Sequence, residues 1–194
     1  MRIYLETERL VLRYFTDEDI DLIVELDSDP EVTRYITGGR PTPPEQVRDE
    51  VLPRWKSFYE RNDGSGYFAA IEKSTGEFLG WFILRPNGKP TRADGSARVG
   101  VELGYRLRRS AWGKGYATEG SKALIRKGFT ELGVERIYAE AMAVHGASQR
   151  VMEKAGLRYV GTCRDDWPDQ VPGDEHGDVE YALTKDEWMA ALPG

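Results

Sequence analysis

The residues of this 194-residue chain that are best placed to do chemistry lie between Val101 and Glu119, in the segment VELGYRLRRSAWGKGYATE. The pattern predicts a strand, a basic turn with two glycines and the first turn of a helix. The first backbone N–H groups of a helix have no partner inside it, and the helix dipole places partial positive charge there. Gly113 and Gly115 lack a Cβ, so a phosphate can approach the backbone closely. The segment is therefore predicted to bind a phosphate-bearing ligand.

Two common phosphate-binding patterns do not fit this turn. The dinucleotide-binding pattern requires a third glycine and a continuous apolar strand before the turn, whereas this strand contains Glu102 and Arg106. The G-x-x-x-x-G-K-S/T pattern of nucleoside-triphosphate loops does not occur in the chain. The charge around the turn is nevertheless suited to an anion, because four cations surround it: Arg106, Arg108, Arg109 and Lys114.

Length, charge and cysteine content narrow the class of protein. The length fits one domain, which we place at residues 1–194, and the formal net charge of −6 argues against a dedicated nucleic-acid binder. Cys163 is the only cysteine, so no internal disulfide can form. The N-terminus lacks the apolar run of a signal peptide, and no apolar stretch approaches the roughly 18 residues of a spanning helix. We therefore expect a cytoplasmic protein that binds neither membranes nor nucleic acid.

The elements that must position the glycine turn can be predicted from periodicity. Alternation and β-branched content predict strands at Glu8–Tyr14, Tyr67–Ile71, Phe78–Leu84, Arg98–Leu107, Arg136–Met142, Leu157–Cys163 and Asp178–Leu183. Helical spacing predicts helices after Thr16, at residues 47–59 with a kink at Pro53, and at residues 116–132, 147–155 and 185–192. Gly133 and Gly156 are expected just after the ends of two of these helices.

The connections between these elements indicate the fold class. The three strands between Tyr67 and Leu107 are consecutive and joined by short polar loops, so they are expected to be antiparallel. The helix between Leu107 and Arg136 makes a crossover, so the strands on either side of it should be parallel. The prediction is an α+β (mixed α/β) fold with a mostly antiparallel, twisted central sheet of about seven strands.

Four segments resemble the GNAT superfamily of acyl-CoA-dependent N-acetyltransferases, and within it the RimJ/RimL-type branch that includes ribosomal-protein N-terminal acetyltransferases. They are ETERLVLR at Glu6–Arg13, ELGYRL at Glu102–Leu107, WGKGYATE at Trp112–Glu119 and ASQRVMEKAGLRYVG at Ala147–Gly161. The resemblance covers almost the whole chain. It implies a GNAT-like sheet flanked by helices on both faces, and acetyl-CoA as co-substrate without a metal. It also implies direct transfer, in a ternary complex, to the primary amine of a protein N-terminus or a small molecule.

The resemblance also implies where the co-substrate lies. The turn would hold the CoA pyrophosphate, the pantetheine would follow the preceding strand, and the two parallel strands would splay apart near Gly104. A backbone N–H close to Leu103–Tyr105 would stabilise the oxyanion. The turn departs from the family pattern Q/R-x-x-G-x-G/A at Ser110, and Arg108 or Arg109 is expected to supply the missing charge. The implied cofactor-binding residues are Leu103, Gly104, Tyr105, Arg106, Leu107, Arg108, Arg109, Trp112, Gly113, Lys114, Gly115, Tyr116, Ala117, His145, Ser148 and Met152.

The expected catalytic residues are Ser148, Glu102 and His145. Ser148 matches the family's N-x-x-S segment and is expected to donate a proton to the departing thiolate, although a serine at a helix start can also simply bond the backbone. Met152 occupies the position where other branches carry a tyrosine acid. His145 replaces the family's asparagine, and we favour a hydrogen-bonding role over a titrating one. His145→Asn should then preserve much of the activity.

The base that accepts the amine proton is left open by the sequence. Glu102 and Glu140 lie on the two parallel strands, and RimL-type relatives carry an acidic group in the C-terminal region. The candidates there are Asp165, Asp166, Glu175, His176, Asp178 and Glu180. Any one of these carboxylates could equally be a solvated surface charge, but together they could attract a protonated amine.

Two other functions remain compatible with the sequence. The departures at Ser110 and His145 would suit a non-catalytic acyl-CoA-binding or regulatory module, and extra cations near the thioester would suit a donor such as succinyl-CoA. An acyl-cysteine route through Cys163 has no evident partner residues. The acceptor walls are expected at Tyr35–Trp55 and Trp167–His176, and the protein is expected to be a monomer or a homodimer.

Overall fold

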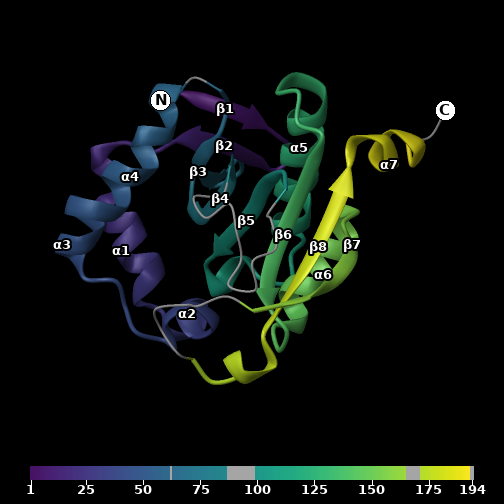
Figure 1. The fold of residues 1–194 in the computed structure, drawn as a ribbon. Coiled ribbons are helices and arrows are strands. Elements are labelled where there is room, and N and C mark those ends of the chain that lie inside the picture. Colours follow the sequence, from purple (N-terminus) through teal and green to yellow (C-terminus); the bar gives the residue numbers. More distant parts are fainter. Residues whose placement is uncertain (62, 87–98, 165–170, 193–194) are drawn as a thin grey trace.

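The computed structural model describes residues 1–61, 63–86, 99–164 and 171–192, and its centre is one eight-stranded sheet with the order β1-β2-β3-β4-β5-β6-β8-β7 (Figure 1). All neighbouring strands are antiparallel except β5 and β6, as the crossover predicted. The strands are β1 (Ile3–Glu6), β2 (Leu10–Tyr14), β3 (Gly66–Glu72), β4 (Phe78–Pro86), β5 (Val101–Leu107), β6 (Arg136–Met142), β7 (Arg158–Cys163) and β8 (Asp178–Thr184). The sheet is thus one strand wider than expected, because β1 was not predicted.

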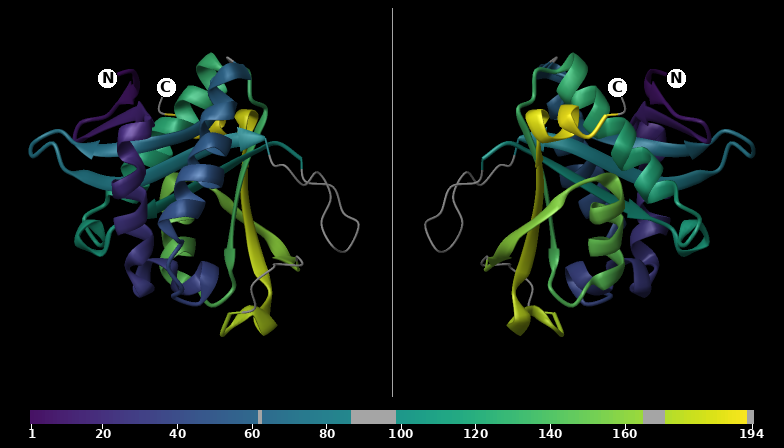
Figure 2. Two further views of the ribbon diagram at one scale, coloured as in Figure 1. Left: turned by 90° about the vertical axis from the view of Figure 1, so that its left-hand side faces the viewer. Right: turned by 90° about the vertical axis from the view of Figure 1, so that its right-hand side faces the viewer.

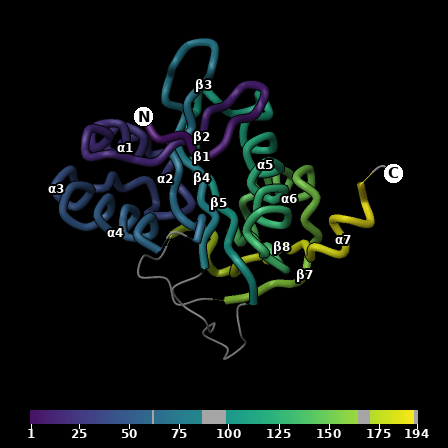
Figure 3. Tube along the Cα trace, turned by 90° about the horizontal axis from the view of Figure 1, so that it is seen from above, coloured from purple at the N-terminus to yellow at the C-terminus, as the bar shows by residue number. Residues whose placement is uncertain are grey.

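Helices cover both faces of this sheet, which confirms the expected GNAT-like architecture. One face carries α1 to α4 and the opposite face carries α5 and α6, as the opposed views of Figure 2 and the view from above in Figure 3 make clear. The helices are α1 (Ile20–Ser28), α2 (Pro30–Thr37), α3 (Pro44–Gln46), α4 (Leu52–Ser57), α5 (Tyr116–Glu131), α6 (Gly146–Ala155) and α7 (Lys185–Ala190). Within the described ranges, no helix has the length and apolar character needed to cross a bilayer.

The two faces of the sheet bury two separate apolar clusters. Leu12, Phe82 and Leu124 belong to the cluster under α5 and α6, whereas Ile23 and Trp81 belong to the cluster under α1 to α4. Strands β3 and β4 are buried along most of their length because both of their faces are covered. A strand covered on both faces has a continuous apolar run, as FLGWFIL does in β4.

Helix α2 was missed by the sequence analysis although its signals are present. The Asp29 side chain accepts a hydrogen bond from the Glu31 N–H (3.0 Å), Pro30 occupies the first turn, and Gly38 ends the helix at φ 68°. An acidic cap, a proline and a terminal glycine are the expected marks of a short helix. The predicted kink at Pro53 takes the form of a π-helical turn at Val47–Val51, just before the proline.

The parallel pair opens toward the end of β5. Only Val101 with Ile137 and Glu102 with Tyr138 are paired between β5 and β6, and the two strands then separate. This confirms the splay expected near Gly104. The separation leaves the carboxyl-terminal halves of both strands available to line a cleft.

Candidate active site

A cleft of about 700 Å³ lies where β5 and β6 separate. It is bounded by those strands, by the first turns of α5 and α6, and by α2. Ten residues predicted to bind the cofactor line it: Tyr105, Arg106, Leu107, Trp112, Gly113, Gly115, Tyr116, Ala117, His145 and Ser148. Six other predicted cofactor residues, namely Leu103, Gly104, Arg108, Arg109, Lys114 and Met152, are not part of this lining, and neither is the predicted catalytic residue Glu102.

The residues outside the lining have identifiable places. Leu103 and Met152 are in the apolar cluster under α5 and α6, and Gly104 packs against Ile83. A second cavity, of about 550 Å³, is lined by Tyr4 and other residues near the β1 edge and contains none of the predicted site residues. The expected chemistry is therefore concentrated in the cleft between β5 and β6.

The glycine turn has the backbone geometry that an anion site needs. Gly113 and Gly115 have φ of 73° and 85°, in the left-handed region that favours glycine. Gly115 is the N-cap of α5, and no side chain caps this helix start. A Cβ added at Gly113 would meet no atom within 4 Å, so the space above the turn is open. Uncapped N–H groups beside open space suit a phosphate.

The arginines around the turn are paired with acidic residues on the other side of the sheet. Each contacts a carboxylate of α1 or of the residue before α2: Arg106 with Asp27, Arg108 with Glu25 (2.9 Å) and Arg109 with Asp29 (2.7 Å). These ion pairs offset part of the positive charge that the sequence analysis assigned to the turn. Arg109 is 58% exposed, so its guanidinium is the one of the three that solvent reaches most.

Ser148 lies in the first turn of α6 and is almost fully buried, with 8% of its surface exposed. The Tyr105 hydroxyl lies 2.9 Å from the Ser148 hydroxyl oxygen and 3.1 Å from the Ser148 carbonyl oxygen. A phenol has one proton, so it donates to one of these two oxygens at a time. When it donates to the serine hydroxyl, the serine proton is free to point elsewhere in the cleft.

The Tyr105 phenol is neutral under ordinary conditions. Burial raises the pKa of Tyr105 to about 12, although the hydrogen bond with Ser148 acts in the opposite direction. Tyr105 is therefore an uncharged hydrogen-bonding group next to Ser148. Tyr105 was expected only to bind the cofactor, and its contact with Ser148 was not predicted.

His145 forms the N-cap of α6 and stacks on Tyr35 of α2, with ring centroids 4.2 Å apart. Burial, and then the positive charge of Arg150, lower the pKa of His145. The imidazole is therefore neutral near pH 7, which favours a packing or hydrogen-bonding role over a titrating one. The stack joins α2 to α6 across one end of the cleft.

Replacing His145 with asparagine should flatten the pH dependence of stability. The unfolded chain has the ordinary His pKa near 6.5, so as the pH falls from about 7 to 5 it binds a proton before the folded chain does. The free energy of unfolding of the natural chain should fall over this range more than that of His145→Asn. Denaturant unfolding at both pH values measures this, with His176→Asn as a control. An equal loss of unfolding free energy between the two pH values in all three proteins would contradict the prediction.

The candidate bases occupy different environments. Glu140 lines the cleft, whereas Glu102 forms an ion pair with Arg85 (2.9 Å) and lies outside the lining. Glu180 is buried and paired with Arg136, and Asp178 is also buried. Glu175 and His176 are paired with each other at 3.5 Å in an exposed segment. Asp165, Asp166 and Trp167 lie outside the described residues.

The described residues contain no cluster of three or more His, Cys, Asp or Glu side chains arranged to hold a metal ion. The expected acceptor wall around Tyr35 does reach the cleft. Trp55, at the other end of that predicted wall, belongs instead to the apolar cluster under α1 to α4. Val171 packs against Gly38 at the end of α2, so the C-terminal segment does approach this wall.

Several residues of the cleft were missed by the sequence analysis. They come from α2 and from the exposed face of α6, and they include Glu31, Arg34, Arg150 and Lys154. Two signals could have found them. The first is the acidic cap before Pro30, and the second is the i, i+4 spacing of Arg150 and Lys154, which places both on one helix face.

Comparison with known proteins gives consistent results. The family model described as "Acetyltransferase (GNAT) domain" matches residues 9–158. A protein of Aspergillus fumigatus, FsC-acetyl coenzyme A-N(2)-transacetylase, is 34% identical over 191 residues, which cover 95% of this chain and 77% of that protein. Both comparisons span the glycine turn and Ser148.

Solved structures share the fold. An acetyltransferase of the GNAT family from Bacillus anthracis is 27% identical, with a TM-score of 0.69, and the match covers 96% of this chain and all of that one. RimL, a ribosomal L7/L12 α-N-protein acetyltransferase solved with coenzyme A, has a TM-score of 0.73 over 96% of this chain and 99% of its own. At 16% identity, the likeness to RimL concerns the fold alone.

Proposed function

This chain belongs to the GNAT acetyltransferase family and is an acetyl-CoA-dependent N-acetyltransferase, and we propose that it transfers the acetyl group directly to a primary amine in the cleft between β5 and β6. The observation that carries the proposal is that the glycine turn and the Ser148–Tyr105 pair line the same cleft. The glycine turn suits a phosphate, and the Ser148–Tyr105 pair suits a departing thiolate. Direct transfer needs both ends of a CoA thioester held in one continuous site.

The glycine turn fits the pyrophosphate of acetyl-CoA. Its uncapped helix start and the open space above Gly113 support this assignment. Acetyl-CoA supplies the acetyl group as a thioester. Arg109, exposed beside the turn, takes the place of the cation that the family pattern carries at Ser110. Backbone groups of β5 beyond Glu102 are free of pairing with β6, and one of their N–H groups near Leu103–Tyr105 stabilises the oxyanion.

Ser148 donates its hydroxyl proton to the departing sulfur, and the proton that the amine gives up to the base returns to the serine oxygen through water. The 2.9 Å contact allows either hydroxyl to donate, and when the Tyr105 phenol donates to the Ser148 hydroxyl oxygen the serine proton is directed at the sulfur. Tyr105 bonds the hydroxyl and carbonyl oxygens of Ser148 and so acts on the sulfur only through the serine. Ser148 is thus the catalytic residue of this step and Tyr105 is the residue that positions it.

Glu140 accepts a proton from the attacking amine, directly or through water. Its place in the cleft lining supports this role over that of Glu102, which is not part of the lining. We expect Glu140→Gln to lower kcat by about 10²-fold, the lower end of general-base effects, with a smaller change in KM for acetyl-CoA. Steady-state kinetics at saturating acceptor measures this, and Glu102→Gln is the matched comparison. A larger kcat loss in Glu102→Gln would transfer the role of base to Glu102.

We propose that the acceptor is a small-molecule amine. The A. fumigatus protein is named for transfer to an N(2) nitrogen, and the Tyr35–His145 stack joins α2 to α6 across the cleft. A protein N-terminus, as in the RimJ/RimL-type branch, is the alternative. The predictions of a single domain, a cytoplasmic location and a monomer or homodimer stay predictions.

Release of CoA thiol with a panel of acceptors tests the proposal. The panel contains small diamines, amino acids and short peptides with a free N-terminus, each supplied with acetyl-CoA. Turnover with small amines exceeding turnover with peptides is the expected result. Tight CoA binding without turnover on any acceptor would instead indicate a non-catalytic acyl-CoA-binding module. Competition between acetyl-CoA and succinyl-CoA decides the donor.

A further inference from the structure

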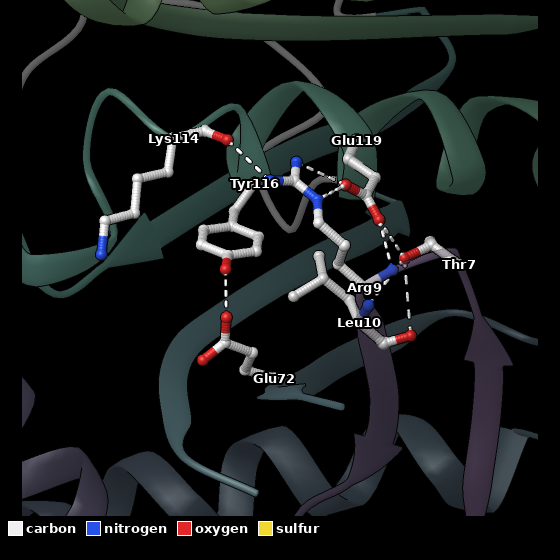
Figure 4. Close-up of polar contacts among 7 residues, drawn as sticks. All are labelled: Thr7, Arg9, Leu10, Glu72, Lys114, Tyr116 and Glu119. Atoms are coloured by element: carbon white, nitrogen blue, oxygen red, sulfur yellow. Dashed lines mark hydrogen bonds and ion pairs between the residues drawn. The ribbon is translucent and has the colours of Figure 1, made fainter. Parts of the chain in front are cut away.

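Two segments that the sequence singled out, ETERLVLR and WGKGYATE, are in direct contact in the folded chain (Figure 4). The Glu119 carboxylate of α5 accepts hydrogen bonds from the Thr7 hydroxyl (2.6 Å), from the Arg9 backbone N–H (2.9 Å) and from the Arg9 Nε (2.6 Å). Thr7 and Arg9 lie in the turn between β1 and β2. This turn is thereby fixed to the first turn of α5, which follows the glycine turn directly.

Arg9 also contacts the glycine turn itself. Its Nη1 donates to the Lys114 carbonyl oxygen (2.9 Å), and its guanidinium lies 4.4 Å from the centre of the Tyr116 ring. A Cβ added at Gly115 would lie 3.4 Å from the Arg9 Nη2. One side chain therefore contacts Lys114 and Tyr116 and lies beside Gly115, without lining the cleft.

The contact with the Lys114 carbonyl has a consequence for the ligand side of the turn. In a trans peptide the C=O and the following N–H point in opposite directions. Holding the Lys114 carbonyl against Arg9 therefore directs the Gly115 N–H away from Arg9. Left-handed glycines have many accessible conformations, so an external contact is needed to select one of them.

Tyr116 is held from its other end. Its hydroxyl donates to the Glu72 carboxylate at the end of β3, while its ring lies against Arg9 (Figure 4). The first residue of α5 is thus fixed between β3 and the turn that joins β1 to β2. The helix start cannot shift without breaking both contacts.

The charge of the contact also matters. Burial by itself would raise the pKa of Glu119, but the hydrogen bonds from Thr7 and Arg9 outweigh burial, and the pKa of Glu119 is lowered. Glu119 is therefore ionised and is within the first turn of α5. An unpaired carboxylate there would repel a pyrophosphate, and Arg9 neutralises it at 2.6 Å.

We propose that Arg9 and Glu119, with Thr7, are positioning residues for the pyrophosphate of CoA: they fix the glycine turn in its anion-binding conformation from outside the cleft. This inference rests on the proposed binding of the pyrophosphate at the turn. It assigns a role to the ETERLVLR segment, none of whose residues takes part in the catalytic steps described above. The three residues touch the turn and the helix start rather than the ligand.

Two acetyl donors distinguish this positioning role from a general structural one. Acetyl-CoA carries the pyrophosphate, whereas S-acetylpantetheine ends before it. Arg9→Gln should weaken the binding of acetyl-CoA by about tenfold, measured as its KM and as the Kd of CoA. This is within the range of one charge-assisted hydrogen bond partly exposed to solvent. Its kcat/KM for S-acetylpantetheine should stay close to that of the natural chain. Thr7→Val removes one hydrogen bond to Glu119 at nearly constant volume. It should lower the ratio of kcat/KM for acetyl-CoA to kcat/KM for S-acetylpantetheine, as Arg9→Gln does, but by a smaller factor.

Arg13 offers the matched control. It lies in the same segment and forms an ion pair with Asp19 (2.6 Å), away from the glycine turn. Arg13→Lys should lower the Tm and leave the ratio between the two donors unchanged. Equal losses on both donors in Arg9→Gln, or no loss on either, would overturn the inference. If the natural chain itself does not prefer acetyl-CoA to S-acetylpantetheine, the proposed pyrophosphate site fails instead.

Discussion

Replacing Ser148 with alanine is expected to lower kcat by about 10²-fold or more, the effect of losing a positioned proton donor. The reason is that the leaving thiolate would then depart without a proton or a hydrogen bond in a buried part of the cleft, where unpaired charge is unfavourable. KM for acetyl-CoA should change little, because the hydroxyl acts mainly in the transition state. Single-turnover kinetics with a saturating amine measures the chemical step directly.

The matched control is Ser121→Ala. Ser121 is also a fully buried helical serine, and within the described residues its hydroxyl oxygen has no hydrogen-bond partner. Its replacement should leave kcat unchanged and should not reduce stability, since no buried partner is left unsatisfied. A loss of activity in Ser121→Ala as large as that in Ser148→Ala would indicate a packing effect.

Tyr105→Phe should lower kcat less than Ser148→Ala does, and the two effects should not be additive. If Tyr105 acts only by orienting the Ser148 hydroxyl, the double variant should be no slower than Ser148→Ala alone. A donor whose thiol is more acidic should reduce both effects, since its thiolate needs less help to depart. Full additivity of the two losses would contradict the positioning role of Tyr105.

Replacing Asp27 with asparagine is expected to destabilise the fold by about 3–5 kcal/mol, the usual effect of removing one partner of a buried ion pair. The Asp27 side chain is 5% exposed, contacts the Arg106 guanidinium, and accepts a hydrogen bond from Thr42 (2.8 Å). Without it, Arg106 remains as an uncompensated charge beside Trp81. Denaturant unfolding followed by circular dichroism measures the change, and the Tm should fall by roughly 6–20 °C.

Two further variants decide the cause of this loss. Asp49→Asn removes the partner of Arg48 in an exposed ion pair, whose Asp49 side chain is 60% exposed, and should leave the Tm unchanged. Replacing Asp27 by leucine and Arg106 by methionine together should recover most of the stability, because no buried charge is then left alone. Failure of the double variant to recover would mean that the shape of the ion pair, rather than its charge, holds α1 against β5.

Most strands and helices were predictable because their periodicity is a local property of the chain. Strand β6 begins and ends at the predicted residues, and α5 and α6 differ from the prediction by one residue at an end. Strand β1 was missed because four residues carry little alternation, and it exists through its pairing with β2. Helix α2 was missed although its cap was visible, and with it the Tyr35 contact to His145.

The site was predicted unevenly for the same kind of reason. Gly113 and Gly115 are marked by their own residue types and neighbours, whereas Ser148 and the splay near Gly104 followed from the resemblance to the GNAT superfamily. The pairing of the three arginines with α1 and its connection to α2 could not be predicted, because it joins positions about 80 residues apart. Nor could the sequence decide which of Glu102 and Glu140 lines the cleft, since that depends on how β5 and β6 separate in the folded chain.

The sequence by itself determined the family, the glycine turn and the residue types at the cleft. These follow from short-range patterns: a turn that only glycine favours, a helix start, and a serine in a matching segment. The tertiary structure alone decided which charges are already paired and which hydroxyl Tyr105 meets. It also brought Arg9 against a turn more than 100 residues later. Such contacts depend on how the strands are ordered in the sheet, and strand order is a property of the whole chain.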